Sequence, residues 1–94
     1  MDENVITAGS LLLRALGNAK RLEILYTLRG GEMNVGELEK RVGLSQSALS
    51  QHLAVLKKAD VVKNRREAQT IYYSVKNAAV LNIMNMLDKF YSRF

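Results

Sequence analysis

Hydroxyl and amide side chains share one face of the segment LSQSALSQHL, residues 44–53. In a helix, Leu49, Leu53 and Leu56 would form an apolar stripe that can pack on a core. The opposite side contains small or amide-bearing residues and a lysine, but no acid: Ser47, Ser50, Gln51, Ala54 and Lys58. Hydroxyls and amides can exchange hydrogen bonds with base edges in the DNA major groove, and an alanine methyl can contact a thymine methyl. The pattern predicts a helix that reads DNA bases.

Two sets of contacts are expected around this helix. Base contacts are predicted for Gln46, Ser47, Ser50, Gln51 and Ala54. Phosphate contacts are predicted for basic, hydroxyl and imidazole side chains: Lys20, Ser45, His52, Lys57 and Lys58. The first turn of a helix favours phosphate because its free N–H groups and its dipole attract anions. The alternative is that Ser45 is only an N-cap and that the polar face is only solvated.

His52 lies at the edge of the apolar stripe, where two roles are open. A partly buried histidine would fix the helix through a hydrogen bond, whereas an outward ring would contact a phosphate. Because the chain has one histidine and no cysteine, we do not expect His52 to bind a metal.

A basic β-hairpin is predicted to follow the helix. The segments 61–66 and 70–75 are rich in β-branched and aromatic residues, and the polar link 67–69 joins them. Arg65, Arg66 and Gln69 surround the expected tip, where a long arginine can enter the negative potential of a narrow minor groove. The alternative is a solvated hairpin whose charges prevent edge-to-edge association.

The remaining segments must position this helix and hairpin, and they predict a single domain, residues 1–94. Glycine and asparagine supply the breaks between elements, because proline is absent. The expected class is mostly α with a β-hairpin wing (α+β), a winged helix-turn-helix in the order α-α-(β)-α-α-β-β-α. The expected ranges are helix 5–16, helix 19–29 capped by Asn18, a minimal strand at 33–35, helix 36–42, a turn at 43–44, helix 46–58 capped by Ser45, the hairpin, and helix 78–91 capped by Asn77.

The terminal helices predict a homodimer. Val80, Met84, Leu87, Tyr91 and Phe94 follow a 4-3-4-3 spacing typical of a coiled-coil seam, and a second apolar face lies beside it. One face can cover the core, and the other requires a second copy. We expect an interface from helices at about 5–16 and 77–92, through Leu12, Val80, Met84, Leu87 and Tyr91. A symmetric dimer would read a pseudo-palindrome. The alternative is that a single core buries both faces.

Composition narrows the class of function. The net charge is +5, and residues 57–66 contain five basic side chains and one acid, which favours a polyanion. Without cysteine there is no disulfide, thiolate metal site or thiol switch. The sequence shows no nucleophile–base pair of the kind that an enzyme would use, so we do not expect an enzyme. We also expect no cofactor and no metal. The expected partners are double-stranded DNA and a second copy, with no membrane. The expected location is the bacterial cytoplasm, because no signal peptide or apolar run of about 20 residues is present.

Four segments together resemble the ArsR/SmtB family of bacterial winged-helix repressors: NAKRLEIL (18–25), VGEL (35–38), LSQSALSQHLAVLKKADVV (44–62) and RREAQTIYYSV (65–75). The resemblance extends from about Leu11 to Tyr91 and is most similar to the NolR/HlyU-like branch. It implies a cytoplasmic dimer that represses by covering promoter DNA, or that derepresses by displacing another silencer.

The sequence departs from the family where its sensing members bind effectors. Some metal-sensing members carry a cysteine motif where this chain has residues 33–37, which contain no thiolate. Others bind metal through Asp and His on the last helix, but here residues 77–88 contain one acid, Asp88, and no histidine. Thiol-sensing relatives carry cysteines where this chain has Tyr26 and Ser92. We therefore expect neither switch. Two alternatives remain: a metal or ligand sensor that uses oxygen and nitrogen ligands, and a winged-helix protein-interaction module without a DNA function.

Overall fold

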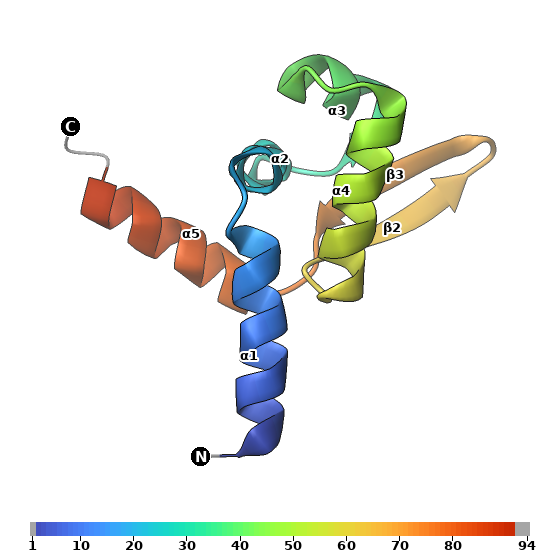
Figure 1. Cartoon of the computed structure of the whole chain (residues 1–94). Helices are drawn as coiled ribbons and strands as arrows, with labels where there is room; N and C mark the ends of the chain where they lie inside the picture. The colour runs from blue at the N-terminus through green and yellow to red at the C-terminus, as the bar shows by residue number, and fades with distance from the viewer. Residues whose placement is uncertain (1, 92–94) are drawn as a thin grey trace.

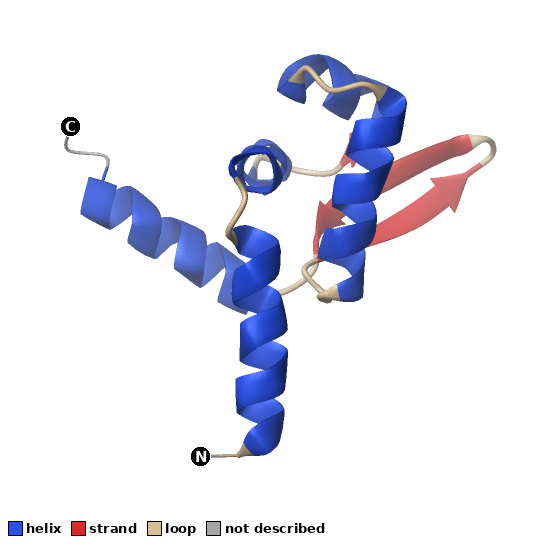
Figure 2. Ribbon diagram, viewed as in Figure 1, coloured by secondary structure: helices blue, strands red, loops and turns tan. Residues whose placement is uncertain are grey.

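The structure is a computed structural model that describes residues 2–91. Its element order confirms the predicted α-α-(β)-α-α-β-β-α arrangement (Figures 1 and 2). The elements are α1 (Glu3–Leu16), α2 (Ala19–Arg29), β1 (Met33–Asn34), α3 (Val35–Val42), α4 (Gln46–Lys58), β2 (Val62–Glu67), β3 (Thr70–Val75) and α5 (Ala78–Tyr91). No helix within residues 2–91 has the length and apolar character needed to span a bilayer.

Side-chain caps set where the helices begin. The predicted caps Asn18, Ser45 and Asn77 are confirmed: each accepts a hydrogen bond from the backbone N–H three residues later, at 3.1, 3.3 and 3.0 Å. Two caps were not predicted. Asp2 accepts from Asn4 N at 2.9 Å, so α1 begins at Glu3 rather than residue 5. Asn34 caps α3, which therefore begins at residue 35 rather than 36.

The three strands form one antiparallel sheet in the order β1-β3-β2. The short β1 pairs with β3 only at Met33–Tyr73 and Asn34–Tyr72, whereas β2 pairs with the whole of β3. Beyond Tyr72 the sheet is therefore a two-stranded ribbon, which projects from the helices as the wing (Figure 2). Ala68, with φ 55°, turns the chain between its strands.

The core lies between the helices and the base of the sheet. Ile24 and Leu25 of α2, Leu38 of α3 and Leu49 and Leu56 of α4 are fully buried there. This burial confirms the predicted stripe of the fourth helix, and it fixes the side of α4 that faces solvent.

The prediction that Val80 and Met84 lie at a dimer interface is wrong. Both side chains are 0% exposed in the single chain, so they have no surface left for a second copy. Their spacing is equally suited to packing on the chain's own core, and Tyr26 binds that part of α5 by donating its hydroxyl to Met84 O at 3.1 Å. Phe94, the end of the predicted seam, and Ser92 lie outside the described residues.

Candidate nucleic-acid interface

The turn between α3 and α4 makes a helix-turn-helix. Gly43, with φ 65°, ends α3 in the left-handed conformation, and its N–H donates to Glu39 O at 2.9 Å. Ser45, two residues later, caps α4, which begins at Gln46. Leu38 and Val42 of α3 are buried with the apolar stripe of α4, so the two helices form one packed unit.

The polar face of α4 is exposed as predicted. Its exposed residues are Gln46, Ser47, Ser50, Gln51 and Ala54, and the exposed Lys57 and Lys58 lie at the end of the helix. Among residues 2–91, the four hydroxyl and amide side chains of this face make no hydrogen bond within the chain. Their donors and acceptors are therefore available to a ligand that approaches the surface.

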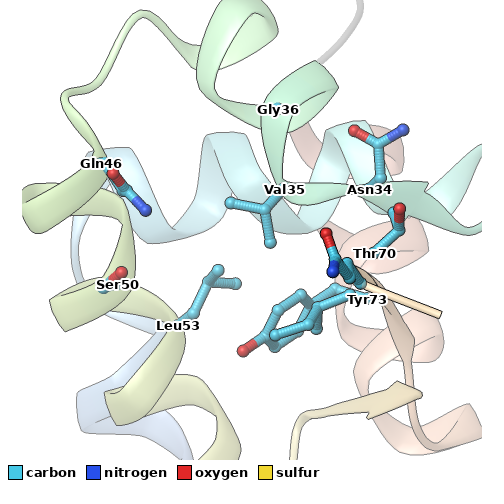
Figure 3. A pocket seen from close by; sticks show the side chains of 10 residues that line it. Asn34, Val35, Gly36, Gln46, Ser50, Leu53, Thr70 and Tyr73 are labelled. Atoms are coloured by element: carbon cyan, nitrogen blue, oxygen red, sulfur yellow. The ribbon is translucent and has the colours of Figure 1, made fainter. Parts of the chain in front are cut away.

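A groove of about 350 Å³ separates α4 from the wing (Figure 3). Gln46 and Ser50 line its α4 side, and Gln69 and Thr70 line its wing side. The floor is more apolar and contains Val35, Leu53, Ile71 and Tyr73. In Figure 3, Ser50, Leu53 and Tyr73 lie around the same opening. The structure thus brings the predicted helix residues and the predicted wing residue Gln69 to one surface.

Arg65 and Arg66 occupy opposite faces of the wing. Arg66 pairs with Ile71, which lines the groove beside α4, and its side chain is exposed. Arg65 pairs with Tyr72 on the other face, because successive side chains of a strand alternate. There it donates to Glu32 at 2.7 and 2.8 Å, and its guanidinium lies 4.4 Å from the Tyr72 ring centroid. The structure therefore places Arg66 with the other site residues and separates Arg65 from them.

Three predicted phosphate contacts, at Lys20, Ser45 and His52, have partners within the chain; Ser45 accepts the capping hydrogen bond from Ala48 N. Lys20 donates to Val42 O at 3.1 Å, at the end of α3, and lies 3.3 Å from a carboxylate oxygen of Glu23. His52 is half-buried, with Nδ1 3.4 Å from Arg21 Nη1. Because a guanidinium can only donate, Nδ1 accepts and the ring proton belongs on Nε2. This geometry favours the structural role for His52.

Sequence reasoning missed Arg21 and Glu32. Arg21 donates to Ala15 O at 2.6 Å and to Arg14 O at 3.2 Å, and so caps the end of α1. It belongs to the NAKRLEIL motif, but helical periodicity does not distinguish it from a solvated arginine. Glu32 has no local signal, since its partner Arg65 is 33 residues away.

The described residues contain no cluster of three or more His, Cys, Asp or Glu side chains that could hold a metal ion. Outside the wing, an ion pair with a neighbouring tyrosine joins α2 to α5. Arg29 Nη1 lies 2.5 Å from Asp88 Oδ2, and its guanidinium lies 4.7 Å from the Tyr26 ring centroid. Burial raises the pKa of Tyr26, and the neighbouring Asp88 raises it further. This cluster fastens α5 to the helical core.

A model of the "Bacterial regulatory protein, arsR family" matches residues 18–64, which include α2, α3 and α4. The nodulation protein NolR of Rhizobium meliloti is 54% identical over 96% of this chain and 72% of its own length. The transcriptional activator HlyU of Vibrio cholerae is 46% identical over 97% of this chain and 83% of its own length. These similarities confirm the expected NolR/HlyU-like branch.

Solved structures show the same fold. The structure of HlyU from Vibrio cholerae has a TM-score of 0.88 at 42% identity, and covers 98% of this chain and 99% of that chain. A homodimeric winged helix-turn-helix DNA-binding domain from Mycobacterium bovis has a TM-score of 0.87 at 25% identity, and covers 96% of this chain and 86% of that one. This chain has the winged helix-turn-helix fold and belongs to the arsR family of bacterial regulatory proteins.

Proposed function

We propose that this chain is a sequence-specific DNA-binding regulator of transcription that acts as a homodimer. The observation that carries the proposal is the polar face of α4, which is exposed, free of acids and without hydrogen-bond partners inside the described chain. It acts by covering promoter DNA or by displacing another silencer. The relatives support this class of function, since one is named a transcriptional activator and another a homodimeric DNA-binding domain.

In the proposed complex, α4 enters the major groove. Gln46, Ser47, Ser50 and Gln51 meet base edges, and Ala54 can contact a thymine methyl. Ser45 at one end and Lys57 and Lys58 at the other lie beside the phosphates. Arg66 and Gln69 extend from the wing on the α4 side, toward the next minor groove. The proposed DNA contacts therefore come from both sides of the groove, the α4 side and the wing side.

The proposed dimer uses exposed apolar surface on the two terminal helices. Val5, Ile6 and Leu13 of α1 are 57%, 54% and 63% exposed, and Met86 and Phe90 of α5 are 65% and 66% exposed. Tyr91, which is also exposed, and the half-buried Leu12 and Leu87 lie on the same helices. Concentrated apolar exposure of this kind marks a protein interface. In Figure 1, α5 and the wing point in opposite directions, so a second copy on α5 leaves the wing free.

A twofold dimer would place two α4 helices on one face of DNA, about 34 Å apart. Such a protein acts where the bacterial chromosome lies, so we propose a cytoplasmic location. The proposal includes no catalytic role, because the matched family consists of regulatory proteins. It includes no cofactor or metal, because the chain has no cysteine and a single histidine.

Selection of bound sequences from a random DNA library tests the proposal. We expect an inverted repeat with half-sites about 10 base pairs apart, confirmed by anisotropy titration of the purified protein. Gln51→Glu would place an acid on the polar face of α4 and should abolish selection. Asn85→Asp adds the same charge on the side of α5 that faces Arg29 and is the matched control. No enriched motif, together with no binding of any fragment at low salt, would contradict the proposal and favour a protein-interaction module.

A further inference from the structure

One ion pair connects the wing to the helical part of the molecule. Arg65 of β2 donates from Nε and Nη2 to the two carboxylate oxygens of Glu32, at 2.8 and 2.7 Å. Glu32 lies in the loop between α2 and β1. The same guanidinium lies over the Tyr72 ring and donates from Nη1 to Glu67 at 3.1 Å. A bidentate, stacked arginine is held in both direction and plane, which a single lysine contact would not achieve.

The pair lies where the sheet changes from three strands to two. Tyr72 of β3 pairs with Asn34 of β1 on one side and with Arg65 of β2 on the other. Beyond that level, β2 and β3 continue as a ribbon without a third strand. An isolated two-stranded hairpin is marginally stable, so its direction depends on what holds its base. Arg65 and Glu32 are therefore at the point where the angle of the wing is set.

Apart from the two ion pairs that Arg65 makes, the ion pairs of the described chain do not involve the ribbon. They join Lys20 to Glu23, Arg29 to Asp88, and Lys76 to Asp60. The charge of Arg65 is balanced by two carboxylates, and hydrogen bonding from Arg65 holds the pKa of Glu32 below its usual range. Arg66, on the α4 side, has no ion-pair partner among residues 2–91. On the Arg65 face, Glu32 and Glu67 offset the charges of Lys63 and Arg65, so the net positive charge of the wing lies with Arg66 on the face that borders the groove.

We propose that Arg65 is a positioning residue: its pair with Glu32, stacked on Tyr72, fixes the angle of the wing so that Arg66 and Gln69 meet DNA. This inference rests on the proposed DNA-binding function. The two arginines therefore have different roles: Arg65 positions the wing, whereas Arg66 contacts DNA. The expectation that both arginines contact DNA is replaced. Glu32, an acid, then supports DNA binding although it would repel DNA directly.

We call the Arg65–Glu32 pair, stacked on Tyr72, the brace. Amide hydrogen exchange of the free protein tests whether the brace holds the wing in the absence of DNA. We expect Glu32→Gln and Arg65→Gln to speed exchange in residues 65–72, while exchange of α2 and α4 stays unchanged. Arg66→Gln, the neighbouring matched control, should leave wing exchange as in the parent protein. Unchanged wing exchange in both Glu32→Gln and Arg65→Gln would overturn the inference.

Titrations with the selected DNA at several salt concentrations test the consequence. We expect Glu32→Gln and Arg65→Gln each to lower affinity about two- to fivefold, the range that an exposed ion pair can supply, with no change in salt slope. Arg66→Gln should reduce the slope by about one, as loss of a phosphate contact does. The double variant should be no weaker than either single variant.

Two results of the titrations would contradict the proposal that Arg65 positions the wing. Stronger binding by Glu32→Gln with a steeper salt slope would mean that Arg65 is a DNA contact that Glu32 restrains. A reduced slope for Arg65→Gln, equal to that of Arg66→Gln, would make Arg65 an ordinary phosphate contact. Failure of the parent protein to bind DNA would instead contradict the proposed function, and hydrogen exchange would still decide whether the brace exists.

Discussion

Nη1 of Arg21 on α2 lies 3.4 Å from Nδ1 of His52, in the middle of α4. The same guanidinium donates to the carbonyl oxygens of Ala15 and Arg14 at the end of α1. One side chain therefore joins three helices. Since α1 belongs to the proposed dimer contact and α4 to the proposed DNA contact, Arg21 connects the two surfaces that must be aligned on an operator.

Arg21→Ala should destabilise the fold by about 1–3 kcal/mol, because it removes charge-assisted hydrogen bonds to two carbonyls and leaves His52 Nδ1 without its donor. Urea unfolding at fixed protein concentration measures the change. Arg41→Ala removes an exposed arginine of α3 and is the control. A loss no greater than that of the control would show that the three-helix contact contributes nothing.

Gly43→Ala should cost about 1–2 kcal/mol through backbone strain alone. Gly43 has φ 65°, a conformation that L-residues avoid, but a Cβ at this position would meet no atom within 4 Å. Gly43→Asn should cost less, because asparagine tolerates the left-handed region. Thermal unfolding of both variants checks the order. Equal stability of the parent protein and Gly43→Ala would contradict the assigned turn geometry.

Gln51→Ala and Arg66→Ala should alter DNA binding in different ways. Loss of a base-reading amide should reduce discrimination at particular base pairs by about 1–3 kcal/mol and leave the salt slope unchanged. Loss of Arg66 should weaken binding evenly across sequences and flatten the salt dependence. Titration of operator and single-base variants at two salt concentrations separates the two effects. Unchanged operator affinity in both variants would show that the docking is wrong.

Phe90→Glu should shift the protein toward monomers while its helices remain folded, because the Phe90 side chain is 66% exposed in one chain. A charge at the centre of an apolar contact should weaken dimerisation about tenfold or more. Sedimentation velocity measures association, and circular dichroism verifies folding. Lys40→Glu, at an exposed position of α3 away from both terminal helices, is the control. A full-strength dimer in Phe90→Glu would place the interface elsewhere.

Asp88→Asn should flatten the acid side of the stability profile. The hydrogen bond from Arg29 holds the pKa of Asp88 below its ordinary value of 3.8, so the folded state favours the carboxylate. Its stabilisation is present above the ordinary pKa and is lost as the pH falls through the lower, folded value. Melting temperatures between about pH 5 and pH 2 test this linkage. Glu3→Gln, an exposed change at the start of α1, should retain the profile of the parent protein. An identical profile in Asp88→Asn would mean that Arg29 does not lower this pKa.

Much of the fold could be predicted because its signals are local. The caps Asn18, Ser45 and Asn77 and the apolar stripe of α4 depend on residues within one or two helical turns. The same periodicity could not decide which apolar side of α5 faces the chain's own core. Val80 and Met84 have the spacing of an interface seam, yet their burial depends on how α5 packs beside α2.

The sequence by itself determined the element order and the face of α4 that carries hydroxyls and amides. These properties follow from backbone periodicity, which is the same whatever the helix or strand packs against. Only the tertiary structure decided that Arg66 is the arginine on the α4 side, that Arg65 pairs with Glu32, and that Arg21 reaches His52. Those partners are 31 and 33 residues apart, and a side chain so distant comes within hydrogen-bond reach only when the whole core has packed.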